Sequence, residues 1–421
     1  MDRESKHVAL FGLFGTGNFG NDGSLEALLP FLRRTVPQGR LICICGHPQV
    51  VERTFGLDAV PIYHKPPPAG AGRAALRLRK AAGKAILWLH AMQHLKRIRV
   101  LIVPGTGILD DFGAWPLSWP LDLVSWFVLA RLMGVKVILV SIGAGPIRHP
   151  VSRWLMKAAA RAAHYRSYRD RTSKAFMVSI GFDARRDPVY PDLAFRLPAP
   201  PSSRRHEVAG QPLTIGVGVM AYCGWRNDAR RGAQIYAAYL AKMTGFVVWL
   251  LDRGHTVRLL MGDQADRRAV DDLVRAVGSR RPERTAASIR FAPAQTLHDV
   301  MQQMADTDLV VATRYHNVVC ALRMGKPTIS VGYAVKNDAL LAQMGLADYC
   351  QSIERLDVAL LETQTTRLIA ERSALEARIR RAAARFDGSL REQEDLLACL
   401  IAGDAGLVPT TRSVDAPDPV T

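Results

Sequence analysis

Short apolar runs alternate with helical stretches along most of the chain. The runs occupy residues 8–13, 41–45, 100–103 and 135–140 in the first half, and 213–219, 257–260, 289–291, 309–313 and 327–330 in the second. Uninterrupted apolar runs of this length are typical of strands that are buried on both faces of a parallel sheet. The alternation therefore predicts an α/β protein with parallel sheets covered by helices.

A polar, proline-rich segment at residues 197–212 separates the two halves and has the composition of a linker. We therefore expect two doubly wound, Rossmann-like domains, residues 1–200 and 201–402, that face one another across a cleft. A long helical stretch at residues 366–400 would close the fold, and residues 403–421 have the composition of a disordered tail.

The chain is strongly basic, with a formal net charge of +18 for 421 residues. The excess is concentrated between Lys65 and Arg99, where no acid occurs and apolar residues are interleaved with the cations. A solvated helix is the preferred interpretation of this stretch, and contact with an anionic membrane surface or another polyanion is the alternative. Nucleic acid is not an expected partner, because no nucleic-acid-binding motif accompanies the charge.

The remaining composition is that of a cytoplasmic enzyme, with the inner face of the plasma membrane as the alternative location. The segment from Met1 to His7 carries both charge signs, which does not fit a signal peptide. The six cysteines are scattered without a C-x-x-C pair, so we expect reduced thiols and no structural metal. Asp110 and Asp111 are adjacent acids that are expected to cap a turn rather than to hold a cation.

The most informative chemistry follows the apolar run at 309–313, which ends in Arg314 and His316. Ligands of open α/β sheets bind at the carboxyl ends of the strands, which is where both side chains are expected. An arginine there can bind a carboxylate or phosphate, and a histidine can transfer a proton near neutral pH. The alternative is an arginine paired with a structural aspartate and a histidine that caps a helix.

Glycine-bearing turns follow several strands of the first half and predict a concave floor lined by backbone. The residues concerned are Gly15, Gly17, Asn18, Gly20, Gly105, Gly107, Gly143 and Gly145, with Arg169 and Asp170 at a further turn. The first turn fits G-x-G-x-x-G, but the run at 41–45 leads into Gly46 and His47 rather than an acid. A nicotinamide enzyme is therefore not expected.

The joint order of these motifs resembles the polysaccharide pyruvyl transferase family over roughly residues 8–346. The motifs are Gly17-Asn-x-Gly20, Gly105-x-Gly107-x-Leu-x-Asp111, Gly143-x-Gly145-Pro, Arg169-Asp170-x-x-Ser173, Pro191-Asp-x-Ala-Phe195, Arg314-x-His316 and Tyr333-x-x-Lys336. The chain departs from the usual pattern at Asn21-Asp22-Gly23, where Asp-Glu-Ala is common, at Thr106, where a glycine is usual, and at Thr313, where methionine is frequent.

The resemblance implies a two-domain fold similar to that of GT-B glycosyltransferases. It also implies transfer of a pyruvyl group from phosphoenolpyruvate to sugar hydroxyls, as a ketal, with a saccharide or lipid-linked glycan as acceptor and no cofactor. Phosphoenolpyruvate carries a phosphate and a carboxylate, so we expect cations to bind it: Arg169, Arg314 and Lys336, beside Tyr333 and the glycine turns. His316 is the expected acid or base, with Asp22 or Asp170 as its carboxylate partner.

Two other functions remain open at this stage. A GT-B glycosyltransferase would use Arg314 and Lys336 on the phosphates of a nucleotide sugar. A non-catalytic scaffold for polysaccharide assembly would use the basic stretch between Lys65 and Arg99 to rest on a membrane. Thermal stabilisation by phosphoenolpyruvate, by a nucleotide sugar or by neither distinguishes the three functions.

Overall fold

The structure is a computed structural model that describes the chain outside residues 1–6, 38–39, 64–72, 202–210, 225–228 and 404–421, and without the side chains of 73–82 and 229. Lys65, most of the expected linker and nearly all of the expected tail thus lie outside the described residues. The chain forms two compact units: Met1–Thr16, Ser24–Leu193 and Ser389–Thr421 make the first, and Gly17–Gly23 and Ala194–Gly388 the second.

This division differs from the expected boundaries of 1–200 and 201–402. A segment near the start of the chain belongs to the second unit, and a segment near its end belongs to the first. Gly23 belongs to the second unit, where it lies close to the buried side chain of Leu297. Gln393 belongs to the first unit: its amide accepts a hydrogen bond from Ser141 at 3.1 Å and donates one to Ser167 at 2.9 Å. Tertiary contacts far from these segments in sequence therefore decide where each one belongs.

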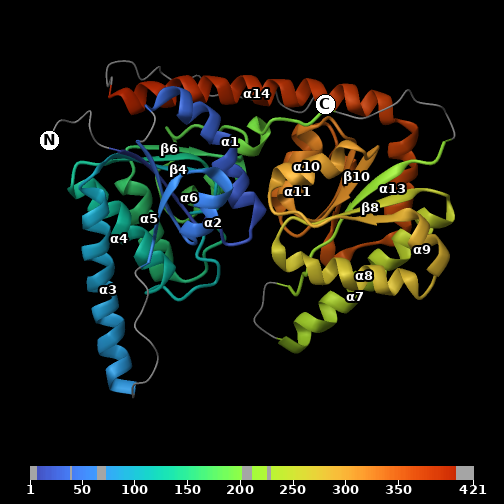
Figure 1. Cartoon of the computed structure of the whole chain (residues 1–421), viewed down its shortest axis with the longest axis horizontal. Coiled ribbons are helices and arrows are strands. Elements are labelled where there is room, and N and C mark those ends of the chain that lie inside the picture. The colour runs from blue at the N-terminus through green and yellow to red at the C-terminus, as the bar shows by residue number, and fades with distance from the viewer. Residues whose placement is uncertain (1–6, 38–39, 64–72, 202–210, 225–228, 404–421) are drawn as a thin grey trace. The chain divides into compact units, whose positions relative to one another are not determined.

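The first unit is a parallel six-stranded sheet of order β3-β2-β1-β4-β5-β6. Strands β4 and β6 of this sheet are labelled in Figure 1. Its strands are β1 His7–Gly12, β2 Leu41–Cys45, β3 Asp58–Pro61, β4 Ile98–Pro104, β5 Lys136–Ile142 and β6 Tyr165–Tyr168. Its helices are α1 Phe19–Thr35, α2 Pro48–Phe55, α3 Arg73–Leu95, α4 Trp119–Leu132, α5 Pro150–Ala162 and α6 Arg171–Ser179. The first turn of α1 and the first part of the last helix of the chain belong to the second unit.

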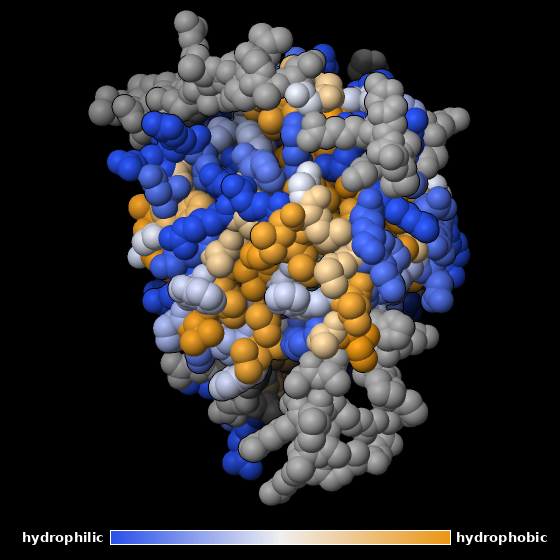
Figure 2. Space-filling view, turned by 90° about the vertical axis from the view of Figure 1, so that its left-hand side faces the viewer, coloured by the Kyte–Doolittle hydropathy of each residue, from blue (hydrophilic) through white to orange (hydrophobic). Residues whose placement is uncertain are grey.

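Helices α3, α4 and α5 pack against one another in sequence order on this unit. Their inner sides contribute to a large core, in which Trp126, Phe127 and Phe11 are fully buried. Their outer side is unusual, because the surface of this side of the molecule carries a broad apolar area between hydrophilic ones (Figure 2).

The second unit is also a parallel six-stranded sheet, of order β12-β11-β10-β7-β8-β9. Its strands are β7 Thr214–Gly218, β8 Thr256–Leu260, β9 Ile289–Phe291, β10 Leu309–Ala312, β11 Thr328–Gly332 and β12 Cys350–Ser352. Its helices are α7 Ala229–Asp252, α8 Arg267–Gly278, α9 Pro282–Ser288, α10 Leu297–Ala305, α11 Tyr315–Arg323, α12 Val335–Gln343, α13 Val358–Ala370 and the first part of α14 Arg372–Ala402. The predicted class, two doubly wound α/β domains with parallel sheets, is confirmed.

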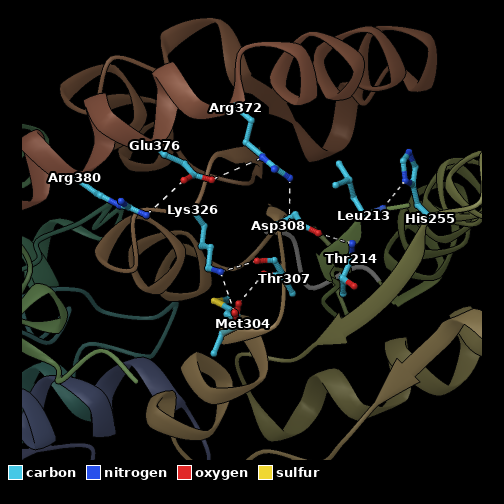
Figure 3. A network of polar contacts seen from close by, with 11 residues as sticks. Leu213, Thr214, His255, Met304, Thr307, Asp308, Lys326, Arg372, Glu376 and Arg380 are labelled. Atoms are coloured by element: carbon cyan, nitrogen blue, oxygen red, sulfur yellow. Dashed lines mark hydrogen bonds and ion pairs between the residues drawn. The ribbon is translucent and has the colours of Figure 1, made fainter. Parts of the chain in front are cut away.

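A polar network fixes the amino ends of β7 and β10 to α14 (Figure 3). Asp308 accepts hydrogen bonds from the backbone N–H of Thr214 at 2.7 Å and from Arg372 at 3.2 Å. The buried Lys326 donates to the carbonyls of Thr307 at 2.6 Å and Ala305 at 3.1 Å. Because these groups hold the base of β10, they also fix the position of the residues that follow its carboxyl end.

Within the described residues, one helix is long and apolar enough to cross a membrane: Arg230–Asp252, with a mean hydropathy of 1.2. This segment is nearly all of α7, which packs against α8, α13 and β8. One side of the helix is buried, with Phe246, Val247 and Leu250 fully buried, so α7 is a covering helix of the second sheet.

Candidate functional site

Five loops of the second unit carry the residues that define the candidate site. The sheet order reverses between β7 and β10, since the chain proceeds from β7 outward to β8 and β9 and then returns to β10 on the other side. In open α/β sheets a ligand binds outside the carboxyl ends of the strands at such a reversal. At this edge, Gly218 ends β7, and Gly262, Arg314 and Tyr333 follow β8, β10 and β11. The segment Gly17–Gly23 belongs to the same unit.

Arg314 is held by a buried carboxylate. Its Nε donates to Oδ2 of Asp266 at 2.9 Å, and its Nη2 donates to Oδ1 at 2.7 Å. Burial lowers the pKa of Arg314, but the hydrogen bonds and negative charge of Asp266 outweigh it, and the net pKa is raised. The guanidinium is therefore permanently charged and fixed in one plane, with Nη1 outside the paired edge.

Both carboxylate oxygens of Asp266 accept hydrogen bonds from donors of the second unit. The backbone N–H of Gly262 donates to Oδ2 at 3.2 Å, and that of Ala221 donates to Oδ1 at 3.3 Å. Each carboxylate oxygen thus accepts one bond from Arg314 and one from the backbone, and the side chain has no exposed surface. The alternative from the sequence, an arginine paired with a structural aspartate, describes this pair correctly, and the pairing orients the cation at the strand end.

His316 lies against the first turn of α1. A Cβ placed on Gly20 would be 1.9 Å from Nδ1 of His316, so only glycine leaves room for the imidazole. The side chain of Asn18 accepts hydrogen bonds from the backbone N–H groups of Gly20 at 3.1 Å and Asn21 at 3.2 Å, which fixes this turn. Asp22 follows in the same turn, in the same unit as His316, and is buried.

Asp263 is a second acid at this edge. It forms an isolated bridge with Asn18, and the backbone N–H of Gln264 donates to the carbonyl of Gly17 at 3.0 Å. Burial raises the pKa of Asp263, while its bond from Ala265 and the charge of Arg314 oppose that effect. The loop after β8 therefore supplies both the carboxylate that orients Arg314 and a second carboxyl group, Asp263, whose pKa is raised.

Lys336 lies over two aromatic rings. Its Nζ is 5.1 Å from the ring centre of Tyr315 and 5.6 Å from that of Tyr333, within the range of a cation–π interaction. The ring of Tyr333 is 6.3 Å from that of Tyr222, whose hydroxyl donates to Glu354 at 2.6 Å. These contacts hold the ammonium group at the carboxyl end of β11.

Asn317 is a fully buried amide beside Arg314. Its nitrogen is 3.0 Å from the position of a Cβ on Gly218, and its oxygen is 2.8 Å from that on Gly262. Neither atom has a hydrogen-bond partner within the described residues. A buried amide without a partner is costly, and Asn317 is such a polar group, enclosed by two glycine turns beside Arg314.

Arg169 and the other glycine turns belong to the first unit. Arg169 donates to Asp192 at 3.3 Å and to the carbonyl of Gly105 at 3.4 Å, and a Cβ on Gly143 would be 2.7 Å from its Nη2. Asp170 caps α6 by accepting from the N–H of Ser173 at 2.6 Å and lies 3.6 Å from Arg169. Arg169 is thus neutralised by two acids, as Arg314 is by one.

Gly107, Gly145 and the adjacent acids complete this edge of the first sheet. The N–H of Gly145 donates to the carbonyl of Leu109 at 2.9 Å, so the loops after β4 and β5 are joined. Asp110 and Asp111 accept from the backbone N–H groups of Phe112 at 2.8 Å and Gly113 at 3.0 Å. The expected turn caps are therefore present. Within the described residues, no group of three His, Cys, Asp or Glu side chains is arranged to hold a metal ion.

Asp263, Asp266 and Asn317 were not predicted from the sequence. A signal was present for the two acids: Gly262-Asp-Gln-Ala-Asp266 follows the apolar run at 257–260 and places a glycine and two acids at a strand end. No local signal existed for Asn317, since its environment depends on Gly218 and Gly262 from two other strands.

The fold is similar to those of solved UDP-GlcNAc 2-epimerases and glycosyltransferases. Staphylococcus aureus MnaA solved with UDP aligns at a TM-score of 0.59 and 11% identity over 96% of this chain and 99% of that one. UDP-GlcNAc 2-epimerase from Neisseria meningitidis aligns at a TM-score of 0.54 and 8% identity over 92% of this chain and 100% of that one. A glycosyltransferase from Rickettsia africae aligns at a TM-score of 0.58 and 10% identity over 95% of this chain and 100% of that one. These likenesses define a GT-B-like fold, as predicted.

The family is defined by sequence. A family model described as polysaccharide pyruvyl transferase matches residues 18–334, from Asn18 to the residue after Tyr333. The chain belongs to this family, which confirms the resemblance and indicates a pyruvyl transferase enzyme. No curated protein matches the chain significantly by sequence.

Proposed function

We propose that the protein transfers the pyruvyl group of phosphoenolpyruvate to two hydroxyls of a saccharide or lipid-linked glycan, forming a pyruvate ketal. The observation that carries this proposal is the Arg314–Asp266 pair, two residues from His316, in a chain of this family. Asp266 holds the planar guanidinium by one edge, which leaves Nη1 directed away from the pair for one anionic group of the donor. Lys336 supplies a second cation at the next strand end.

The chemistry requires one carbon protonation and two hydroxyl deprotonations. A proton adds to the methylene carbon of phosphoenolpyruvate, and the oxygen of the first hydroxyl bonds to the adjacent carbon as its proton leaves. The phosphate then departs with the electron pair of its carbon–oxygen bond. The second hydroxyl adds to the resulting oxocarbenium centre and loses its proton, which completes the ketal. Nearby cations favour departure of the phosphate.

His316 is the proposed acid and base, because a histidine exchanges protons near neutral pH and its ring is fixed by Gly20. Asp22 is the better carboxylate partner of the two from the sequence analysis, since it shares a unit and a helical turn with Gly20. Asp170 is already used as the cap of α6. Asp263, whose pKa is raised by burial, is a further proton donor for the methylene carbon. Arg169 is proposed to bind the donor from the first unit.

Calorimetric titration with phosphoenolpyruvate at moderate salt tests the donor, because salt screens non-specific attraction to the basic chain. We expect saturable binding by the wild type, about tenfold weaker binding by Lys336→Met, and nearly unchanged binding by His316→Gln. Phosphate release with an acceptor should fall by roughly 10²–10⁴-fold in His316→Gln. Stabilisation by a nucleotide sugar but not by phosphoenolpyruvate would instead indicate a glycosyltransferase.

A further inference from the structure

Large apolar side chains are exposed mainly on the first unit. Among the described residues, Trp115 is 67% exposed and Trp154 is 63% exposed, values far above those of ordinary core-facing tryptophans. Together with four neighbours they form what we term the apolar face: Trp88, Leu89, Phe112, Trp115, Leu117 and Trp154. Exposed patches of this kind mark sites of contact with another surface.

The apolar face is contributed by α3, α5 and the loop before α4. The indole N–H of Trp88 donates to Ser125 of α4 at 3.0 Å, which places this part of α3 beside α4. The ring of Trp115 lies 5.7 Å from that of His149, the residue that caps α5. Helices α4 and α5 pack closely along their length. The space-filling view of this side shows hydrophobic residues gathered near its middle, interspersed with a few hydrophilic ones (Figure 2).

The segment that carries the apolar face exposes charge of a single sign. Residues 83–162 contain three acids, and none is exposed: Asp111 and Asp122 are each 5% exposed, and Asp110 is partly buried. The exposed charged residues of this segment are all cationic: Lys96, Arg97, Arg131, Arg148, Arg153 and Arg161. Arg148 and Arg153 lie within a few residues of Trp154. A segment that exposes tryptophans together with cations is complementary to anionic headgroups above an apolar layer.

We propose that the apolar face docks the first unit on an anionic phospholipid bilayer. Trp115 and Trp154 would enter the interface, where an indole places its apolar body in the acyl region and its N–H among the headgroups. Arg148 and Arg153 would bind lipid phosphates. A second copy of this chain is the less suitable occupant, because a two-fold interface would bring the same cations together from both sides. This proposal does not depend on the identity of the donor or acceptor.

Vesicle flotation of the full chain tests the proposal. We expect the wild type to float with vesicles that contain roughly a third phosphatidylglycerol and not with pure phosphatidylcholine, with binding that weakens as salt is raised. Arg148→Gln with Arg153→Gln should weaken binding roughly 30-fold, from about fivefold for each charge near the surface. Trp115→Ala with Trp154→Ala should weaken it at least tenfold. Leu360→Ala is the matched control. This leucine is an exposed apolar residue, 47% exposed, but it lies on α13 of the second unit and outside the apolar face.

Each alternative outcome overturns the proposal. Absence of flotation by the wild type, equal flotation with both kinds of vesicle, or variants that float like the wild type would exclude docking by this face. A wild-type dimer that light scattering shows to become monomeric in Trp115→Ala/Trp154→Ala would make the face an interface between copies. Circular dichroism on each variant verifies the fold, and all five substituted residues are exposed, so the variants are expected to fold.

Discussion

Asp266→Asn tests whether a buried carboxylate holds Arg314 in place. Asp266 has no exposed side-chain surface, and each of its oxygens accepts from both the guanidinium and a backbone N–H. In the variant, the new amide nitrogen must face at least one of these donors, and the guanidinium loses its counter-charge. Removal of one partner of a buried ion pair costs about 3–5 kcal/mol. Because the Arg314 side chain is 19% exposed, we place the loss of stability at the lower end of this range, about 3 kcal/mol.

Hydrogen exchange measured by mass spectrometry resolves this effect within the second unit. A loss of about 3 kcal/mol corresponds to roughly 150-fold faster exchange of peptides from β7, β8 and β10 when they open together. Asp271→Asn is the matched control, because Asp271 pairs with Arg267 on α8 at 2.9 Å but both side chains are about half exposed. Its expected cost is below about 0.5 kcal/mol. Equal exchange in the two variants would refute the assignment of Asp266 as the residue that fixes Arg314.

Three further substitutions test neighbouring contacts. Gly20→Ala places a Cβ 1.9 Å from Nδ1 of His316, so we expect the ring to move and phosphate release to fall about 100-fold; unchanged turnover would disprove the contact. Tyr239→Phe removes the 2.9 Å bond to the buried Thr313 hydroxyl and should cost about 1–2 kcal/mol, visible as a lower Tm; an unaltered Tm would contradict it. The folded-state pKa of Asp263 is raised by burial, so its charge destabilises the fold above that pKa and has no effect below the unfolded value near 4. Asp263→Asn should therefore raise Tm at pH 7 but not at pH 3, and an equal shift at both pH values would exclude burial as the cause.

The central strands were predictable, and three edge strands were not. Strands β1, β4 and β10 each contain a continuous apolar run because both faces of a parallel sheet are covered. The missed strands are β3 Asp58–Pro61, β6 Tyr165–Tyr168 and β12 Cys350–Ser352, each at the edge of its sheet. An edge strand has a neighbour on one side only, and these three contain Asp58, Arg166 and Gln351. Polar residues of this kind remove the signal by which a buried strand is recognised.

Arg314 and His316 could be predicted as candidate site residues from local sequence, but their contacts with Asp266 and Gly20 could not. Both residues directly follow an apolar run, so local sequence places them at a strand end. Their partners come from elsewhere: Asp266 lies 48 residues before Arg314, and Gly20 reaches His316 from the first turn of α1. Contacts over such separations depend on the order of strands in the sheet, which a single sequence does not state.

Two departures of this chain from the usual family pattern, Gly23 and Thr313, have neighbours in the structure that account for them. Gly23 stands where alanine is common, and a Cβ there would be 2.3 Å from Cδ1 of the fully buried Leu297. Thr313 stands where methionine is frequent, and its hydroxyl is paired with that of Tyr239 behind the strand end. In both cases a neighbour within the second unit explains the residue, while Arg314 and His316 keep their places. These two departures therefore argue for a repacked support of the same site rather than for a different reaction.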